Sequence, residues 1–248
     1  MEDFKQCLTE SSYSRQEELV FWDCDRNKNA RIATLLNKVA TFAGYDYDAR
    51  GYTHERLYAM QTVFLLSRVA LRIHVLPKAR DILTTTTWEN GSKGAHMQRV
   101  FEMVNQTGTL CVSAKSDWIM VNPLTRKILR PHSFIAKNEA HCPKEIDCPS
   151  PQKILLPKEG LEELGTRSIV WSDLDGNGHL YSGNYGDIIW DYLPTDLQNR
   201  IPQEFFINYS REATLGDQLR LYGFRDGETY QMEGMGEHGI CFTARCVF

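Results

Sequence analysis

The chain has 248 residues, of which 42% are hydrophobic and 24% are charged, and its formal net charge at neutral pH is −4. This composition is that of an ordinary globular protein with room for one large domain or two small ones, and the negative charge argues against nucleic acid as a partner. The sequence shows neither an apolar run near the ~20 residues that a membrane-spanning helix needs nor the basic and apolar segments of a secretory signal, so we expect a cytoplasmic protein without a membrane span.

The first half of the chain predicts a polar turn, then one helix, then several strands. The turn is the stretch WDCDRNKNA over residues 22–30, in which acidic and amide side chains recur at alternate positions. Apolar residues follow at the spacing of a helix that packs one face on a core; they are Ile32, Leu35, Leu36, Val39 and Ala40. Strands are expected where apolar, β-branched residues alternate with polar ones; they cover residues 67–75, 82–89, 96–104 and 110–121.

The second half repeats this order after a proline-rich segment. Residues 131–157 hold five of the nine prolines and show no period, so they are expected to be a linker. A β-branched and aromatic stretch over residues 167–171 predicts a strand before the second turn, DLDGNGHL, which covers residues 173–180. A second amphipathic helix follows and ends at Pro194; its apolar residues are Tyr185, Ile188, Ile189, Tyr192 and Leu193. The strands expected after it cover residues 204–209, 218–224, 229–235 and 240–247.

The two halves align well enough to indicate an internal duplication. The stretch DCDRN at residues 23–27 matches DLDGN at residues 173–177 with an offset of 150 (173 − 23), and the strands that follow match with an offset of 136 (217 − 81). A lone helix with a continuous apolar face has to be covered, and a curved sheet wrapped around it is an economical cover. We therefore predict an α+β protein with two copies of an antiparallel sheet wrapped around a central helix. The expected boundaries are a first domain over residues 1–135, a linker over 136–165 and a second domain over 166–248.

The stretch DLDGNGHLYSGN over residues 173–184 also has features of a calcium-binding loop. It has acidic or amide side chains at loop positions 1, 3 and 5 and glycine at position 6. An EF-hand loop requires a carboxylate at position 12, where this chain has Asn184, and a helix rather than a strand before the loop. A zinc site at His141, Cys142 and Cys148 would lack a second ligand pair at metal spacing. We therefore expect neither a metal nor a cofactor.

The two copies differ at two positions that can carry chemistry. His179 of the second copy stands where the first copy has Asn29, and Glu212 stands where the first copy has Leu76 (212 − 136). A duplicated scaffold does not by itself require an imidazole and a carboxylate in only one half. A histidine at this place could merely hydrogen-bond the nearby backbone, but beside Asp175 and with a carboxylate in reach, catalysis in the second copy is the favoured interpretation.

These motifs resemble the acyl-acyl carrier protein thioesterase family. The run over residues 173–193 is similar to that family's active-site turn and helix, whose Asp-x-Asn-x-His pattern is matched by Asp175, Asn177 and His179. A later strand of the family carries a glutamate, which Glu212 matches in the stretch YSREA. The resemblance covers nearly the whole chain. It implies a tandem (double) hotdog fold, in which a catalytically degenerate N-terminal hotdog binds the acyl chain and a C-terminal hotdog is catalytic.

The resemblance also implies that water hydrolyses a fatty acyl thioester and releases the free fatty acid. Plant members carry a cysteine where this chain has Ala213, and the sequence has no GxSxG elbow, so water and not a side chain is the expected nucleophile. Glu212 is the expected general base, with His179 sharing that task or protonating the departing sulfur. Asn177 is expected to donate to the carbonyl oxygen, and Asp175 to orient His179 or Asn177.

The implied partner is acyl carrier protein, which is strongly acidic, so its docking surface should be basic. Arg126, Lys127 and Arg130 form a candidate docking patch, although an ordinary solvated surface is an equally simple interpretation. The acyl chain should occupy an apolar tunnel of the first copy, and the protein could form a homodimer. Candidates for the tunnel wall are Val39, Phe42, Phe64 and Leu66. Rival functions are a hotdog 3-hydroxyacyl-thioester dehydratase, an acyl-CoA thioesterase and a non-catalytic acyl-binding module.

Overall fold

The computed structural model describes residues 5–134 and 144–248. The strands are β1 (Gln6–Leu8), β2 (Tyr13–Glu18), β3 (Val63–Ile73), β4 (Ile82–Lys93), β5 (His96–Val104), β6 (Leu110–Val121), β7 (Ile128–Leu129), β8 (Glu162–Ser168), β9 (Glu204–Tyr209), β10 (Gln218–Asp226), β11 (Thr229–Gly236) and β12 (Gly239–Val247). The α-helices are α1 (Ile32–Ala49), α2 (His54–Ala59) and α3 (Asn184–Asp191). Short 3-10 helices are η1 (Phe21–Asp23), η2 (Pro131–Ser133) and η3 (Trp171–Asp173).

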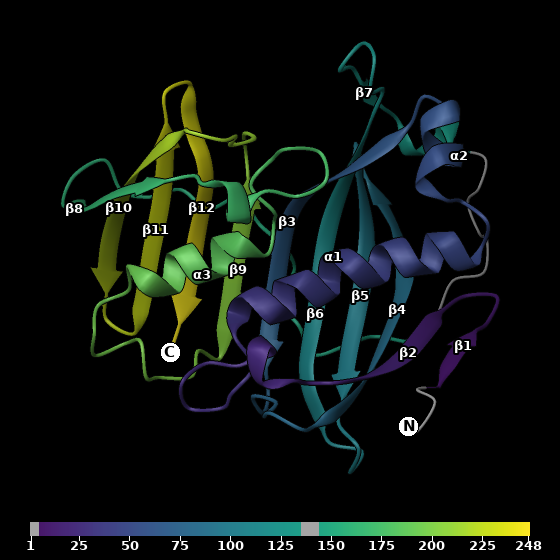
Figure 1. Ribbon diagram of the computed structural model, residues 1–248, viewed down its shortest axis with the longest axis horizontal. Coiled ribbons are helices and arrows are strands. Elements are labelled where there is room, and N and C mark those ends of the chain that lie inside the picture. Colours follow the sequence, from purple (N-terminus) through teal and green to yellow (C-terminus); the bar gives the residue numbers. More distant parts are fainter. Residues whose placement is uncertain (1–4, 135–143) are drawn as a thin grey trace.

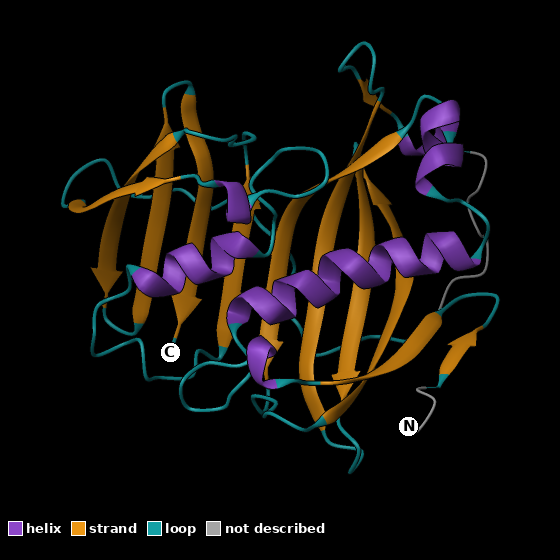
Figure 2. Cartoon of the chain, viewed as in Figure 1, coloured by secondary structure: helices purple, strands orange, loops and turns teal. Residues whose placement is uncertain are grey.

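The strands form one continuous sheet that both halves of the chain share. Its order is β1-β2-β4-β5-β6-β3-β9-β12-β11-β10-β8, with β7 paired to β6 beside this path. The halves join where β3 pairs antiparallel with β9, from Arg68 opposite Asn208 to Arg72 opposite Glu204. Helices α1 and α3 lie on the same face of this sheet (Figures 1 and 2). The predicted α+β arrangement is therefore present, with the two antiparallel sheets joined edge to edge into one.

The two copies share their backbone hydrogen bonds and not only their order of elements. The backbone N–H of Asp25 donates to the carbonyl of Asn29 at 2.8 Å, and that of Asp175 donates to the carbonyl of His179 at 2.8 Å. After each helix the chain returns to the same turn, through isolated bridges between Asn29 and Lys78 and between His179 and Thr214. The residue offsets of these matched bonds are 150 (179 − 29) and 136 (214 − 78), which are the offsets found in the sequence.

One hydrophobic core runs through both copies. The apolar face of α1 buries Leu35, Leu36 and Val39, and α3 buries Ile188 and Ile189 in the same cluster. This face is what the helical spacing predicted, since residues three and four apart lie on one side of a helix. The residues between the copies also pack: Ile154, Cys148, Ala70 and Phe206 form a separate small cluster. Part of the segment expected to be a linker thus covers the sheet at the β3–β9 junction.

The helices approach each other closely at a glycine of α3. A Cβ atom added to Gly186 would lie 2.7 Å from the backbone nitrogen of Ala33 in α1, a distance that real Cβ atoms do not adopt. Only a residue without a side chain permits this approach, so the sequence fixes the crossing point of α1 and α3. Because each helix follows its turn in the chain, this contact also helps to fix the position of one turn relative to the other.

Three local predictions need correction. The strand expected over residues 167–171 lies earlier, at Glu162–Ser168, and the aromatic end of that stretch begins η3 instead. Helix α2 was not predicted and occupies the extra residues that the first copy carries after α1. Glu212 was expected within a strand, but β9 ends at Tyr209, so Glu212 lies in the loop that follows.

Among the described residues, no helix combines the length and the apolar character needed to cross a bilayer.

Candidate active site

The turn between η3 and α3 is held by the side chain of Asp175. Its Oδ1 atom accepts hydrogen bonds from the backbone N–H groups of Asn177 at 2.8 Å and His179 at 3.1 Å. This pattern is an Asx turn, in which a short acidic side chain replaces backbone partners. The role predicted for Asp175 was to orient the side chain of His179 or Asn177. The bonds it makes are to their backbone, so it positions these side chains through the turn itself.

Asp173 fixes the start of the same turn. Its Oδ2 atom accepts from the backbone N–H of Val170 at 2.8 Å, and its Oδ1 atom accepts from the guanidinium of Arg167 at 2.8 Å. The amide of Asn184, at the position where a calcium loop would need a carboxylate, donates to the carbonyl of Asp173 at 3.1 Å. The side chains of Asp173, Asp175 and Asn184 in the calcium-like stretch are therefore engaged in hydrogen bonds that shape the turn. No cluster of three or more His, Cys, Asp or Glu side chains with metal-binding geometry occurs within residues 5–134 and 144–248.

The structure brings His179 and Glu212 together. Their Nε2 and Oε2 atoms are 3.5 Å apart, and the side chains are 32% and 34% exposed. The loop after β9 reaches the turn because the backbone N–H of Leu180 donates to the carbonyl of Ala213 at 2.7 Å. Ala213 itself is fully buried. The two groups that distinguish the second copy from the first therefore meet, as the sequence comparison predicted.

A third charged group reaches this pair from the first copy. The Nη2 atom of Arg126 lies 2.6 Å from Oε2 of Glu212. Arg126 belongs to the turn between β6 and β7, and 86 residues separate the two partners in the sequence. Sequence reasoning placed Arg126 in a docking patch and missed this contact, since no local pattern links residues so far apart.

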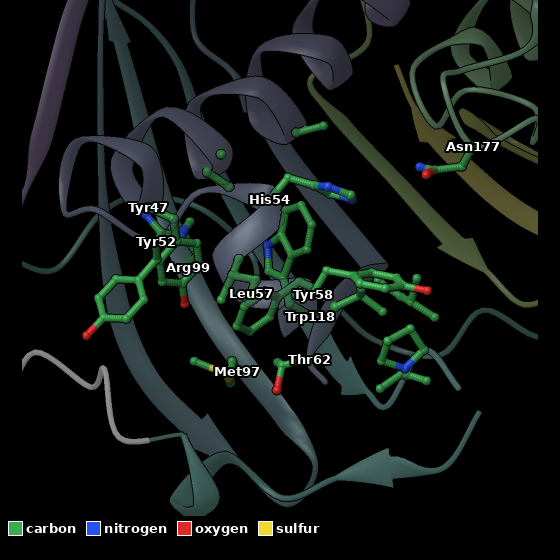
Figure 3. Close-up of a pocket in the computed structure, with 18 of the residues that line it drawn as sticks. Tyr47, Tyr52, His54, Leu57, Tyr58, Thr62, Met97, Arg99, Trp118 and Asn177 are labelled. Atoms are coloured by element: carbon green, nitrogen blue, oxygen red, sulfur yellow. The ribbon is translucent and has the colours of Figure 1, made fainter. Parts of the chain in front are cut away.

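These residues line one end of a large cavity between the copies. Its volume is about 460 Å³. Asn177, His179, Glu212 and Arg126 line it together with residues of α1, α2, β3 and β5. In Figure 3, Asn177 stands apart from Tyr47, Tyr52 and Arg99, with Trp118 and Tyr58 between them. The cavity thus extends from the polar turn of the second copy into the first copy.

The wall of the cavity is mostly apolar in its middle part. It includes Ala40, Ala43, Gly44, Leu57, Val63, Phe64, Leu65, Met97, Trp118 and Val121. Of the four tunnel candidates, Phe64 lines the cavity, whereas Val39 and Phe42 are fully buried in the main core and Leu66 packs against that core. An apolar wall of this kind suits a hydrocarbon chain, because each buried methylene gains about 0.8 kcal/mol.

A buried polar network adjoins the end of the cavity away from Asn177, where Tyr47, Glu89 and Arg99 line it. The hydroxyl of Tyr47 donates to Glu89 at 2.6 Å, and Arg99 donates to Asp46 at 2.7 Å. Arg50 binds the other oxygen of Asp46 at 2.8 Å. Burial raises the pKa of Tyr47 well above its usual value, so this hydroxyl stays protonated and remains a donor. An apolar molecule that extended beyond this point would have to separate buried charged groups from their partners, which is unfavourable. These groups therefore limit how far an apolar molecule can extend into the protein.

Comparisons with known proteins agree with this site and fold. The model of the acyl-ACP thioesterase N-terminal domain matches residues 10–136, and that of the acyl-ACP thioesterase C-terminal domain matches residues 162–238. The chloroplastic acyl-acyl carrier protein hydrolase FATB2 of Cuphea viscosissima is 28% identical over 190 residues, which is 73% of this chain and 45% of that protein. Oleoyl-acyl carrier protein thioesterase 1 of Arabidopsis thaliana is 22% identical over 236 residues, 85% of this chain and 63% of that protein. The chain therefore spans about half to two thirds of the length of these relatives.

Solved structures show the same fold along nearly the whole chain. An acyl-ACP thioesterase from Bacteroides thetaiotaomicron superposes with a TM-score of 0.83 at 23% identity, covering 97% of this chain and 100% of that chain. The 12:0-ACP thioesterase from Umbellularia californica superposes with a TM-score of 0.74 at 16% identity, covering 95% and 96% of the two chains. The tandem hotdog fold that the sequence predicted is thereby confirmed.

Proposed function

Because the chain belongs to the acyl-acyl carrier protein thioesterase family, we propose that it hydrolyses the thioester of a fatty acyl group carried on acyl carrier protein. The products are the free fatty acid and the carrier thiol. One observation carries this proposal: His179 and Glu212 meet at one end of a largely apolar cavity of about 460 Å³. A polar pair at the mouth of an apolar channel suits a substrate with one reactive carbonyl and a long hydrocarbon tail.

In the proposed reaction, a water molecule attacks the thioester carbonyl carbon. Glu212 takes a proton from that water, a task that requires a carboxylate within hydrogen-bond reach of it. The C–S bond then breaks, and His179, as general acid, gives a proton to the departing sulfur. The 3.5 Å between Nε2 and Oε2 allows a proton to pass between the two groups with little movement.

Asn177 is the proposed stabiliser of the carbonyl oxygen. Its side chain lines the cavity beside the His179–Glu212 pair, and its backbone is fixed by the hydrogen bond to Asp175. An amide N–H held in place before the reaction stabilises the negative charge that develops on this oxygen, which typically supplies a factor of ~10²–10³ in rate. Asp175 takes part only by holding this turn.

The first copy is the proposed container of the acyl chain. Apolar residues of α1, α2 and β3 line the cavity, and Arg99, which is bound to Asp46, lines its end away from Asn177. Carrier docking at Arg126, Lys127 and Arg130, a cytoplasmic location and a homodimer stay predictions. Lys127 is exposed next to the mouth-lining Arg126, which supports a docking surface near the cavity entrance.

The test is a thiol-release assay with saturated acyl thioesters of several chain lengths, on acyl carrier protein and on coenzyme A. We expect release of free thiol, and faster release from the carrier protein than from coenzyme A. A conjugated enoyl product from a 3-hydroxyacyl thioester, without thiol release, would identify a dehydratase instead. Binding of acyl thioesters without any turnover would leave only an acyl-binding module.

A further inference from the structure

The contact between Arg126 and Glu212 crosses the cavity entrance from one copy to the other. Glu212 lies in the catalytic copy, and Arg126 lies in the copy that carries neither the histidine nor the glutamate. We propose that Arg126 is a positioning residue of the active site, which fixes the carboxylate of Glu212 for its reaction with water. This inference rests on the proposed function, and it gives the first copy a part in catalysis beyond holding the acyl chain.

The backbone of Arg126 adopts a conformation that is unfavourable for arginine. Its φ angle is +59°, in the left-handed region that costs a residue with a side chain roughly 1–2 kcal/mol. Glycine or asparagine is the usual residue at such a place in a strand-to-strand turn. A strained residue that a turn does not need points to a function for its side chain. The guanidinium of Arg126 contacts the carboxylate of Glu212, which agrees with a function of this kind.

The turn that carries Arg126 is held by four hydrogen bonds to or from Asn122. The side-chain oxygen of Asn122 accepts from the backbone N–H groups of Leu124 at 3.0 Å and Thr125 at 2.9 Å. The backbone N–H of Arg126 donates to the carbonyl of Asn122 at 2.8 Å, and Asn122 donates to the carbonyl of Lys127 at 2.9 Å. The guanidinium is therefore delivered from a fixed base and not from a flexible loop.

The geometry at the carboxylate explains what Arg126 does there. Both Nη2 of Arg126, at 2.6 Å, and Nε2 of His179, at 3.5 Å, approach the same oxygen of Glu212, Oε2. Both of these contacts therefore lie on one side of the carboxylate, at Oε2 and not at Oε1. A charge-assisted hydrogen bond restricts the rotation of a side chain that is one-third exposed. Arg126 thus holds Oε2 beside His179 and leaves Oε1 to accept the proton of the attacking water.

The test compares Arg126→Gly with a matched control, Arg80→Gly. Arg80 also has a left-handed φ angle, +76°, and binds a glutamate, Glu18, at 2.7 Å. It is 69% exposed, against 66% for Arg126, and does not line the cavity. The two substitutions remove the same charge and relieve the same backbone strain, but only one touches the active site. The substrate is a saturated acyl-N-acetylcysteamine thioester, which has no carrier protein to dock.

We expect Arg126→Gly to lower kcat on this small substrate on the order of 10- to 100-fold, with a smaller change in KM, because a misplaced catalytic group loses rate. Its melting temperature should be equal to or above that of the parent protein, because glycine suits the turn. Millimolar guanidinium ion should restore part of kcat, and Arg126→Lys should retain more than Arg126→Gly. Arg80→Gly should keep the parent kcat.

Three outcomes would overturn the inference. An unchanged kcat on the small thioester, together with weaker turnover of acyl carrier protein substrates, would make Arg126 a docking residue only. A fall in melting temperature that accompanies the loss of kcat, without rescue by guanidinium, would make it a structural residue. Absence of turnover in the parent protein on every thioester would remove the proposed function, and the inference with it.

Discussion

The two copies of the hotdog have nearly the same turn and very different chemistry. Asp25 accepts hydrogen bonds from the backbone N–H groups of Asn27 at 2.7 Å and Asn29 at 2.9 Å, as Asp175 does from Asn177 and His179. The first copy thus keeps the acidic residue although it has Asn29 in place of the histidine. The turn alone explains the aspartate of this motif, so the proposed difference in catalysis between the copies depends on the other residues.

The clefts beside the two turns differ in the residues and in the helix that line them. The cleft at the first turn has a volume of about 440 Å³ and is lined by Asn29 and Leu76, the counterparts of His179 and Glu212. Residues of α3, which has 8 residues, line this cleft, whereas residues of α1, which has 18, line the cavity at the second turn. A longer helix extends the apolar wall. In the proposed function, the second copy therefore supplies the reactive groups and the first copy supplies the longer container.

The largest effect is expected when His179 and Glu212 are replaced by the residue types at the matching positions of the first copy. We expect His179→Asn and Glu212→Leu each to reduce kcat for thioester hydrolysis about 10²–10⁴-fold, the usual contribution of a general acid or base. Glu212→Gln keeps the shape of the side chain and should lose about as much activity. Thiol release at saturating substrate measures the effect, with the melting temperature as a check on folding. Near-normal turnover in Glu212→Gln would remove this residue from the mechanism.

The sequence predicted the parts of the fold that depend on local periodicity. The apolar spacing of α1 and α3 and the repeated offsets placed both helices, most strands and the residues at both turns. It also identified His179 and Glu212, because a comparison within the chain showed where the copies differ. The duplication served as an internal reference for these two residues, whereas Asp175 and Asn177 have identical counterparts in the first copy, and their predicted roles came from the family resemblance.

The parts that the sequence did not predict depend on contacts between distant residues. Arg126 meets Glu212 only because β3 and β9 join the two copies edge to edge. The pairing of Asp46 with Arg99 joins α1 to β5, and neither residue belongs to a recognisable motif. Helix α2 has 6 residues, too few to show a clear period, so its segment read only as extra residues in the first copy. Long-range charge pairs of this kind follow from the fold and not from spacing.

The far end of the cavity offers a second contrast between the copies. Asp46 in α1 and Asp196 in the turn after α3 both bind an arginine, Arg99 at 2.7 Å and Arg225 at 2.8 Å. The first pair is almost completely buried, whereas the second is about half exposed. We expect Asp46→Ala to destabilise the protein by about 3–5 kcal/mol, because the buried Arg99 loses its nearest carboxylate and is left with the more distant carboxylate of Glu89 at 3.5 Å. Asp196→Ala should cost no more than about 1 kcal/mol. Denaturant unfolding measures both, and equal losses would contradict this contrast.

Replacing either of two helix glycines by alanine should change the stability by a smaller amount, and the two changes should have opposite signs. A methyl group at Gly186 would collide with the backbone of Ala33, whereas one at Gly44 of α1 would meet no atom within 4 Å. We expect Gly186→Ala to cost about 1–3 kcal/mol through overpacking. Gly44→Ala should instead stabilise by about 0.5–1 kcal/mol, since alanine favours a helix over glycine. Melting curves of the two variants measure both effects, and a tolerated Gly186→Ala would show that the helices can move apart.

The smallest expected effect comes from two buried glutamates at matching places on the two sheets. Glu102 lies opposite Thr86 and Ser113, and Glu233 lies opposite Tyr222 and Thr243. Thr86 and Tyr222 differ by the strand offset of 136 (222 − 86), so the two glutamates are counterparts. Lys144 pairs with the carboxylate of Glu102. No side chain in the described parts of the chain forms an ion pair or hydrogen bond with that of Glu233, and burial raises its pKa above the usual value.

A raised pKa in the folded state means that the fold disfavours the ionised form of Glu233. The penalty is absent below the ordinary pKa of a glutamate, develops as the pH rises through the raised value and is complete above it. Glu233→Gln should therefore raise the melting temperature at pH 8, and the gain should shrink towards zero at pH 4. Glu102→Gln should lower the melting temperature at pH 8, because it removes the partner of Lys144. If Glu233→Gln gave the same gain at both pH values, its cause would be packing and not charge, and the two glutamates would not differ in the way their surroundings indicate.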